Sequence, residues 1–308
     1  MAEKLLALKI DVDTWRGTRA GVPRLLDALR RHDVRATFLF SLGPDHTGRA
    51  VKRVFRKGFL QKVSRTSVVE HYGFRTLLYG TFLPGPDIGR REAALMRSVR
   101  DAGHEVGIHC WDHIRWQDHV AQQDVQWTQR EMRRAAERYR EIFGSPALTH
   151  GAAGWQMNPA AFTFERELGF EYASDVRGIC PFQPVDDRGA ILGIPQIPTT
   201  LPTLDELIGL DGLTVDNVHE FLLAETSDRV HSPQVYTLHA ELEGLRLAPT
   251  FEKLLTGWLR QGYRLASCHD VFNSLDISSL PRHRIATGEL AGRSGTLALQ
   301  GEVYQPTI

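Results

Sequence analysis

Short apolar runs alternate along this chain with segments whose apolar residues recur at helical spacing. The runs suited to buried strands cover residues 5–10, 36–42, 105–108, 235–238 and 263–266. The helical segments cover residues 22–31, 88–102, 120–143, 159–168, 218–225 and 251–261. Because repeated strand–helix units bring parallel strands together, the pattern predicts an α/β fold with a parallel sheet or barrel. In such folds the chemistry takes place where the strands end.

The composition excludes several classes of function. The 308 residues carry a formal net charge of +0, so no overall positive field attracts nucleic acid. Cys110, Cys180 and Cys268 are widely spaced and odd in number, which indicates a reducing compartment. The N-terminal apolar run is too short for a signal peptide, and no stretch approaches the ~20 apolar residues of a membrane span. We therefore expect a cytoplasmic protein without a transmembrane anchor. The oligomeric state is left open.

Two acidic residues follow the first predicted strand. Asp11 and Asp13 are separated by one residue, so strand geometry places both carboxylates on one side. Two carboxylates in a desolvated position repel each other unless a cation or a proton offsets them. The pair therefore indicates a metal or acid–base site. A solvated strand end that caps the next helix is the alternative.

Histidines stand at the ends of two further predicted strands. His109 and His113 are four residues apart, which suits two ligands of one divalent ion on one face of a helical turn. With 13 histidines in the chain, such a spacing also arises by chance. His239 follows another strand and is a candidate general acid, although a lone histidine there is often structural. Together with Asp13, the histidine pair predicts a metal site that leaves positions for water and substrate.

These pieces resemble the motifs of the polysaccharide deacetylase family, the NodB-homology carbohydrate esterases. The matching stretches are residues 10–14, 109–113 and 238–239. The resemblance implies a distorted, incomplete (β/α) barrel in which Asp13, His109 and His113 hold a divalent metal ion. Zinc suits these ligands, and manganese or cobalt is the alternative. The resemblance also implies that Asp11 is the general base and His239 the general acid.

One motif departs from the family pattern. Where the family has Arg-x-Pro-x-Gly, residues 150–154 read His-Gly-Ala-Ala-Gly, so the arginine that orients the base is missing. Arg177 is the expected substitute, unless it is a surface residue paired with Asp175. Trp155 and Glu241 are further expected contacts to the substrate, with a position on the loop surface as the alternative for Glu241.

Longer blocks are similar to one bacterial branch of this family. They cover residues 11–26, 104–113, 152–155, 196–203, 239–244 and 285–292. Members of that branch remove the formyl group from 4-deoxy-4-formamido-L-arabinose linked to undecaprenyl phosphate. The resemblance implies the same reaction on a polyprenyl-phosphate-linked amino sugar, for a lipid A modification that protects against cationic antimicrobial peptides. The alternatives are deacetylation of another N-acyl sugar or of a peptidoglycan- or chitin-like polymer, and a barrel that only binds lipid-linked sugar.

A basic and apolar segment interrupts the strand–helix rhythm at about residues 43–87. Residues 46–69 contain no acidic side chain, and their apolar residues recur at helical spacing among basic ones. This pattern predicts a basic amphipathic helix on an anionic membrane surface, with a solvated helical face as the alternative. The expected contacts are Arg49, Lys52, Arg53, Phe55, Arg56, Lys57 and Phe59.

We therefore expect a single deacetylase-like barrel over residues 1–280 that contains this insertion. Residues 281–308 form a tail that packs on the barrel or lies near the membrane. The expected location is the cytoplasmic face of the inner membrane, where the protein binds as a peripheral protein.

Overall fold

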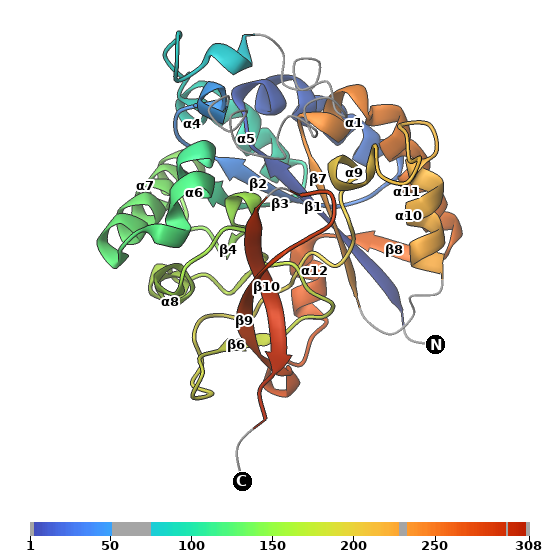
Figure 1. Ribbon diagram of the computed structural model, residues 1–308. Helices are drawn as coiled ribbons and strands as arrows, with labels where there is room; N and C mark the ends of the chain where they lie inside the picture. The colour runs from blue at the N-terminus through green and yellow to red at the C-terminus, as the bar shows by residue number, and fades with distance from the viewer. Residues whose placement is uncertain (1–2, 51–74, 228–232, 294, 306–308) are drawn as a thin grey trace.

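The computed structural model describes residues 3–50, 75–227, 233–293 and 295–305 (Figure 1). Within these ranges seven parallel strands form the main sheet, in the order β5-β4-β3-β2-β1-β7 with β8 also beside β1. The strands are β1 (Lys4–Val12), β2 (Thr37–Ser41), β3 (Glu105–Cys110), β4 (Thr149–His150), β5 (Tyr172–Ala173), β7 (Gln234–His239) and β8 (Tyr263–Ala266). β8 pairs with the first half of β1 and β2 with its last part, so both lie on one edge of β1 and β7 lies on the other.

An extended, proline-rich stretch over residues 195–202 fills the gap between β5 and β7, the two outer strands of the main sheet. The amide of Ile197 donates to the carbonyl of Ala173 in β5, and the amide of Thr200 donates to the carbonyl of Val235 in β7. The stretch therefore joins the ends of the sheet through irregular backbone instead of a regular strand. The prediction of a distorted, incomplete (β/α) barrel is confirmed.

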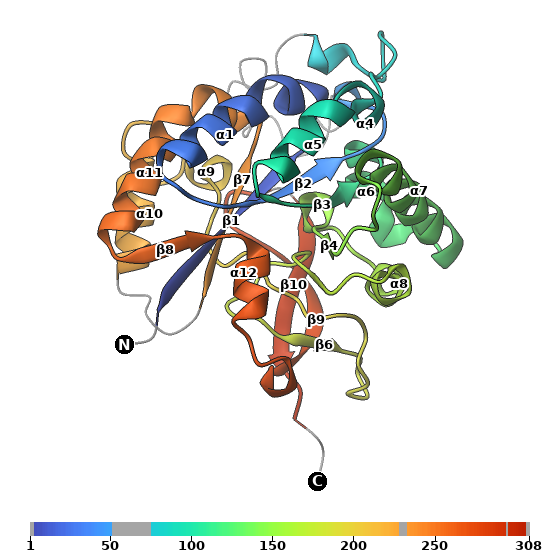
Figure 2. The ribbon, with the colours of Figure 1, turned by 180° about the vertical axis from the view of Figure 1, so that it is seen from behind.

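Most helices cover one face of the main sheet, whereas the short helix over residues 268–273 packs against Leu5 and Ala7 on the other face, where a smaller sheet also lies. In Figure 2 helices α1 and α5 stand in front of the main sheet, whereas the C-terminal strands lie in front of it in Figure 1. The helices are α1 (Val22–Arg31), α4 (Ile88–Arg91), α5 (Ala93–Asp101), α6 (His113–His119), α7 (Val125–Phe143), α8 (Pro159–Leu168), α9 (Leu204–Leu207), α10 (Val218–Ser227), α11 (Ala248–Arg260) and α12 (Cys268–Asn273). The smaller sheet has the order β10-β9-β6 and consists of β6 (Gln183–Val185), β9 (Arg282–Glu289) and β10 (Thr296–Val303). In the part of the chain described, we find no helix with the length and apolar character needed to traverse a bilayer.

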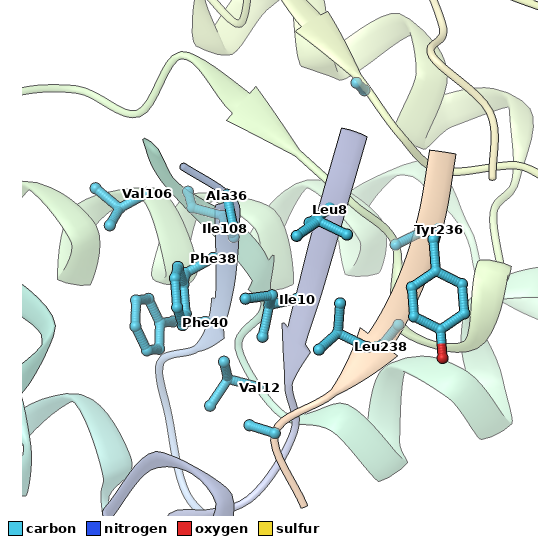
Figure 3. Close-up of a cluster of buried hydrophobic side chains, with 14 of the residues drawn as sticks. Leu8, Ile10, Val12, Ala36, Phe38, Phe40, Val106, Ile108, Tyr236 and Leu238 are labelled. Atoms are coloured by element: carbon cyan, nitrogen blue, oxygen red, sulfur yellow. The ribbon is translucent and has the colours of Figure 1, made fainter. Parts of the chain in front are cut away.

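Alternation along β1 sends one set of side chains into the main core, whereas the other side carries apolar Leu5 and Ala7 near its start and becomes polar toward its end. The side chains of β1 and β2 that enter the main core, seen in part in Figure 3, are Leu6, Leu8, Ile10, Val12, Phe38 and Phe40. The residues between them point to the opposite side of the strand, where Lys9 and Asp11 are both buried. Because burial of each large apolar side chain contributes about 1.5–3 kcal/mol, the helix-side core fixes which residues line the polar side.

The predicted helices are largely confirmed, with two corrections. The helix predicted over 120–143 begins only at Val125, because Asp124 caps it by accepting from the amide of Trp127 at 2.7 Å. The helix predicted over 88–102 is divided at Glu92 into α4 and α5. There the Glu92 carboxylate accepts from the indole N–H of Trp15 at 2.6 Å.

His104 is a buried titratable residue beneath the sheet. Its Nδ1 accepts from the amide of Ala36 at 3.2 Å, and its ring lies 5.3 Å from that of Phe38. Burial lowers the pKa of His104 from 6.5 to about 4, and the charge of Arg35 adds to this effect. The folded protein therefore favours the neutral imidazole.

We expect the free energy of unfolding to fall as the pH drops from 6.5 toward 4. The pKa is lower in the folded state, so His104 contributes fully above its unfolded value of 6.5, and this contribution is lost as the pH falls through about 4. Urea unfolding of the native protein and of His104→Gln across this range measures the effect. The difference between the two proteins should shrink at acid pH. A difference independent of pH would contradict the assignment.

Candidate active site

The carboxyl end of β1 carries two buried carboxylates on the polar side of the sheet. Asp11 is 2% exposed and Asp13 is 8% exposed, as their spacing predicts. Glu241, in the loop after β7, fixes the chain here. Its Oε1 accepts from the amides of Asp13 at 3.1 Å and Thr14 at 2.7 Å, and from the Thr14 hydroxyl at 2.7 Å. Gly17 completes the turn, because a Cβ there would collide with the Glu241 carboxylate. Glu241 is therefore a buried partner of the Asp13 loop and not a loop-surface residue.

His109 lies near the end of β3, with its ring oriented by the neighbouring chain. Its Nδ1 is 2.6 Å from the carbonyl oxygen of Gly151, an arrangement in which Nδ1–H donates and Nε2 stays available as a ligand. Nε2 lies 3.2 Å from Oδ1 of Asp13. The Gly151 carbonyl thus directs His109 toward Asp13.

His113 approaches Asp13 from the first turn of α6. Its Nε2 lies 3.4 Å from Oδ2 of Asp13, and its ring centroid lies 5.3 Å from that of His109. The prediction that both histidines share a helical turn is wrong, because β3 ends at Cys110 and α6 begins only at His113. Asp112 caps α6 by accepting from the amide of Arg115 at 3.1 Å, and this sharp strand-to-helix change brings the two rings together.

The three side chains fit a divalent metal ion. One potential ligand atom from each of Asp13, His109 and His113 lies within 4.8 Å of the others. Oδ1 of Asp13 is buried and has no hydrogen-bond partner among the described residues. Burial alone would raise the pKa of Asp13, but His113 and His109 lower it far below its usual value, so Asp13 is a carboxylate. One carboxylate and two imidazoles suit zinc or a similar ion and leave coordination positions for other molecules.

Lys9, not Arg177, is the basic partner of Asp11. Lys9 is 0% exposed, and its Nζ lies 3.3 Å from Oδ2 of Asp11. Gly151 makes room for it, because a Cβ at that position would approach Cε of Lys9 to 3.0 Å. Arg177 instead donates to Oε1 of Glu206 at 2.6 Å. The prediction that Arg177 orients Asp11 is therefore wrong, since another carboxylate holds its guanidinium.

His239 ends β7 directly beside Asp11. The two residues are register partners on adjacent parallel strands, so their side chains emerge on the same side of the sheet. The amide of His239 donates to Glu243 at 2.9 Å, and its Nδ1 lies 3.9 Å from Asp205. Burial alone would lower the pKa of His239, but Asp205, Asp13 and Glu243 raise it to about 9. The imidazole is therefore protonated at neutral pH.

Trp155, an expected substrate contact, and Asp175, the suggested alternative partner of Arg177, are both buried. Trp155 donates from Nε1 to the Thr199 hydroxyl at 3.2 Å, and Nζ of Lys9 lies 5.1 Å from its ring centroid. Asp175 accepts from the amide of Ala152 at 2.8 Å. Both residues therefore act on the turn at 150–155 that carries the Gly151 carbonyl.

A second buried group, made of residue types that can also bind metal ions, supports the same turn. It consists of His150, Glu165 and Asp175. Nδ1 of His150 lies 3.1 Å from Glu165 and 2.8 Å from Asp175. Burial raises the pKa of Glu165 well above its usual range, and the charge of Asp175 adds to this. Burial alone would also raise the pKa of Asp175, but His150 lowers it. A protonated Glu165 donates a hydrogen bond to the charged Asp175, so the three side chains form a hydrogen-bonded support of the turn.

The sequence analysis missed two residues that adjoin the site. Lys9 stands two positions before Asp11 on the same strand, so the alternation that paired Asp11 with Asp13 also indicates that Lys9 faces them. Asp205 gives no such signal, because it follows the irregular stretch and reaches His239 only through the tertiary fold.

The comparisons with known proteins agree with this geometry. Residues 1–173 match the family model of the polysaccharide deacetylases. The probable 4-deoxy-4-formamido-L-arabinose-phosphoundecaprenol deformylase of Shewanella sediminis is 37% identical over 300 residues, which cover 97% of this chain and 95% of the relative. The protein of the same name from Wigglesworthia glossinidia brevipalpis is 31% identical and covers 94% of this chain and 100% of its own. This chain belongs to the polysaccharide deacetylase family, and the resemblance inferred from its motifs is confirmed.

Solved structures show the same fold. A protein from Mycobacterium smegmatis assigned to the polysaccharide deacetylases gives a TM-score of 0.61 at 17% identity, covering 94% of this chain and 96% of that one. A peptidoglycan N-acetylglucosamine deacetylase gives a TM-score of 0.54 at 13% identity, with coverages of 88% and 89%. At these identities the similarity concerns the fold alone.

We expect Asp13→Asn, His109→Ala and His113→Ala each to lose bound metal. Each change leaves two of the three protein ligands, too few to hold a divalent ion tightly. Elemental analysis of the purified variants measures the metal content.

His119→Ala is the matched control, because His119 is an exposed histidine at the other end of α6. It should keep the metal content of the native protein. Full metal content in the three ligand variants would show that the ion, where present, is bound elsewhere.

Proposed function

We propose that this protein hydrolyses the N-formyl amide of 4-deoxy-4-formamido-L-arabinose carried on undecaprenyl phosphate. The products are formate and the free amino sugar lipid, which serves lipid A modification and resistance to cationic antimicrobial peptides. The observation that carries the proposal is the arrangement at the end of the sheet. Asp11 and His239 stand side by side on adjacent strands, next to Asp13, His109 and His113. The two relatives named as deformylases span nearly the whole chain and support the formyl sugar as substrate.

The residues present divide the proposed reaction between a base and an acid. Asp13, His109 and His113 would hold a divalent ion, which would supply polarisation of the amide carbonyl and a lower pKa of bound water. Asp11 accepts a proton from the attacking water while the C–O bond forms at the formyl carbon. His239 gives its proton to the nitrogen while the C–N bond breaks, so that a neutral amine leaves instead of an amide anion.

The proposed base Asp11 and the proposed acid His239 each have buried charge partners. Lys9 compensates Asp11 inside the barrel, where loss of one partner of a buried ion pair typically costs about 3–5 kcal/mol. Asp205 and Glu243 stabilise protonated His239. The interior thus holds the base beside a lysine and the acid beside two carboxylates within one site.

Loss of the formyl group from a lipid-linked substrate tests this function. The metal-loaded protein, incubated with formamido-arabinose linked to a prenyl phosphate, should release formate, and mass spectrometry should show the free amino sugar lipid. Asp11→Asn should bind metal but turn over about 10²–10⁴-fold more slowly, because a base is lost and no ligand. His239→Gln should behave in the same way.

Two outcomes would favour the alternatives. Release of acetate from chitin-like or peptidoglycan fragments, without deformylation, would indicate a polymer deacetylase. Tight binding of the formyl sugar lipid by a metal-loaded protein that never cleaves it would indicate a binding barrel.

The proposed location is the cytoplasmic face of the inner membrane, with the protein bound peripherally. Residues 51–74, which include Lys52, Phe55 and the other predicted membrane contacts after Arg49, lie outside the described residues. Arg49 is partly buried and donates to the carbonyl of Gly80 at 3.1 Å. The loop over residues 75–87, drawn in cyan in Figure 1, contains Phe82, which is 85% exposed. Tyr79 of this loop packs edge-on against Trp15, two residues after Asp13, so the loop contacts the segment that follows the candidate metal ligand.

We expect Phe82→Asp to weaken binding to anionic vesicles. The change removes an apolar side chain from the interface and adds repulsion from the lipid charge. Co-sedimentation with vesicles at low and high salt measures the effect. Ile179→Asp is the matched control, since Ile179 is also an exposed apolar residue, at 74%, and lies beside β10 instead. Equal loss in both variants would place the contact elsewhere on the surface.

A further inference from the structure

Two arginines share one carboxylate beside the catalytic candidates. Nη1 of Arg177 lies 2.6 Å from Oε1 of Glu206, and Nη1 of Arg293 lies 3.2 Å from the same oxygen. The guanidiniums of Arg177 and Arg293 also lie 5.0 and 4.5 Å from the ring centroid of Trp155. All four side chains are largely buried.

The two guanidiniums share a single hydrogen-bonded carboxylate. Lys9 has Asp11 at 3.3 Å, and His239 has Asp205 at 3.9 Å. Glu206 is the ion-pair partner of both Arg177 and Arg293, and the charge of Asp205 also acts on Arg177. A guanidinium that shares its carboxylate in a poorly solvated position interacts strongly with any anion that reaches it.

The arginine pair adjoins the catalytic candidates on two sides. Trp155 lies against both arginines and also against Lys9, the partner of Asp11. Glu206 directly follows Asp205, which faces His239. Trp155 and Glu206 therefore link Arg293 to the charge partners of the base and of the acid.

The C-terminal hairpin brings Arg293 to this place. β10 docks on Arg177 through two backbone hydrogen bonds, from the Arg177 amide to Ala298 at 3.1 Å and from the Gln300 amide to Arg177 at 2.8 Å. The connection between β9 and β10 rests on α9, where Gly292 is required because a Cβ would collide with the Glu206 carbonyl. Its φ of +80° also favours glycine. The hairpin is thus fixed at Arg177 through β10 and next to Arg293 through Gly292.

We propose that Arg293, supported by Arg177, binds the phosphate diester of the lipid-linked sugar. This inference rests on the proposed function. In that substrate one sugar ring separates the phosphate from the formamido nitrogen, so the phosphate must bind next to the catalytic side chains. Guanidinium groups bind phosphate oxygens through paired N–H donors. Glu206 engages Nη1 of Arg293, and no other hydrogen-bond partner of this guanidinium, which lies over the Trp155 ring, occurs among the described residues, so donors are available.

Two water-soluble substrates separate phosphate recognition from catalysis. One is the formamido sugar linked to a short prenyl phosphate, and the other is its methyl glycoside, which lacks the phosphate. In Arg293→Gln, kcat/KM for the phosphodiester should fall about 10- to 100-fold through KM. For the methyl glycoside it should change by less than about twofold. Arg293→Lys should retain part of the preference, because it keeps the charge and loses the paired donors.

Arg284→Gln is the matched control, because Arg284 lies on the same hairpin and pairs with exposed Asp187 at 3.8 Å. It should affect neither substrate. Equal losses on both substrates in Arg293→Gln would overturn the proposal and show that Arg293 only holds the hairpin. Unchanged kinetics on the phosphodiester would overturn it too.

The native protein provides a readout that needs no variant. Dimethylallyl phosphate should inhibit hydrolysis of the methyl glycoside competitively, and absence of inhibition would overturn the phosphate site. Equal kcat/KM of native protein for both substrates would also overturn it while leaving the proposed function intact. Deformylation of neither substrate by metal-loaded native protein would overturn the proposed function and this inference with it.

Discussion

The buried charges on β1 are the constraint on which the rest of the site depends. Lys9, Asp11 and Asp13 alternate with core residues, so the packing that buries Ile10 and Val12 also forces three charged groups into the barrel interior. Unpaired charges there are costly, and each must find a partner. Lys9 and Asp11 compensate each other, whereas Asp13 faces two histidines and retains an oxygen with no hydrogen-bond partner in the described part of the chain. Asp11 therefore has a fixed partner in Lys9, whereas Asp13 is available as a ligand of a metal ion.

Loops from distant parts of the chain act mainly to keep these charges in place. The turn at Gly151 does this twice, since its carbonyl orients His109 and its missing Cβ admits Lys9. Asp175 holds that turn through Ala152, and Glu241 holds the Asp13 loop from the opposite side. The family arginine is absent from this turn, and the positive charge comes from β1 instead. The replacement conserves the charge near Asp11 while changing the element that supplies it.

The sequence predicted the parts of the site that depend on strand periodicity and on strand ends. Asp11, Asp13 and His239 fall where alternation and strand boundaries place them, and Lys9 carries the same signal. Arg177 was misplaced because its partner Glu206 lies in the first turn of α9, after an irregular stretch whose path depends on tertiary contacts. The histidine pair was placed on a helix because spacing alone does not reveal the change from β3 to α6. The strands β9 and β10 escaped prediction because most of their residues are polar or partly exposed and show no buried apolar run.

The position of the C-terminal hairpin separates recognition from chemistry. The family model covers residues 1–173, which contain Asp11 and all three candidate metal ligands. Glu206, His239 and the hairpin lie beyond it, in the part where the irregular stretch completes the barrel. A hydrolytic centre of this kind acts on many amides, so selectivity must come from groups that bind the rest of the substrate. The hairpin pairs with β6 and contacts Arg177, Gln156 and α9, whereas the candidate metal ligands come from the ends of β1 and β3 and from α6. The structure thus joins a metal-ligand group at the ends of β1 and β3 and the start of α6 to a C-terminal hairpin that the family model does not cover.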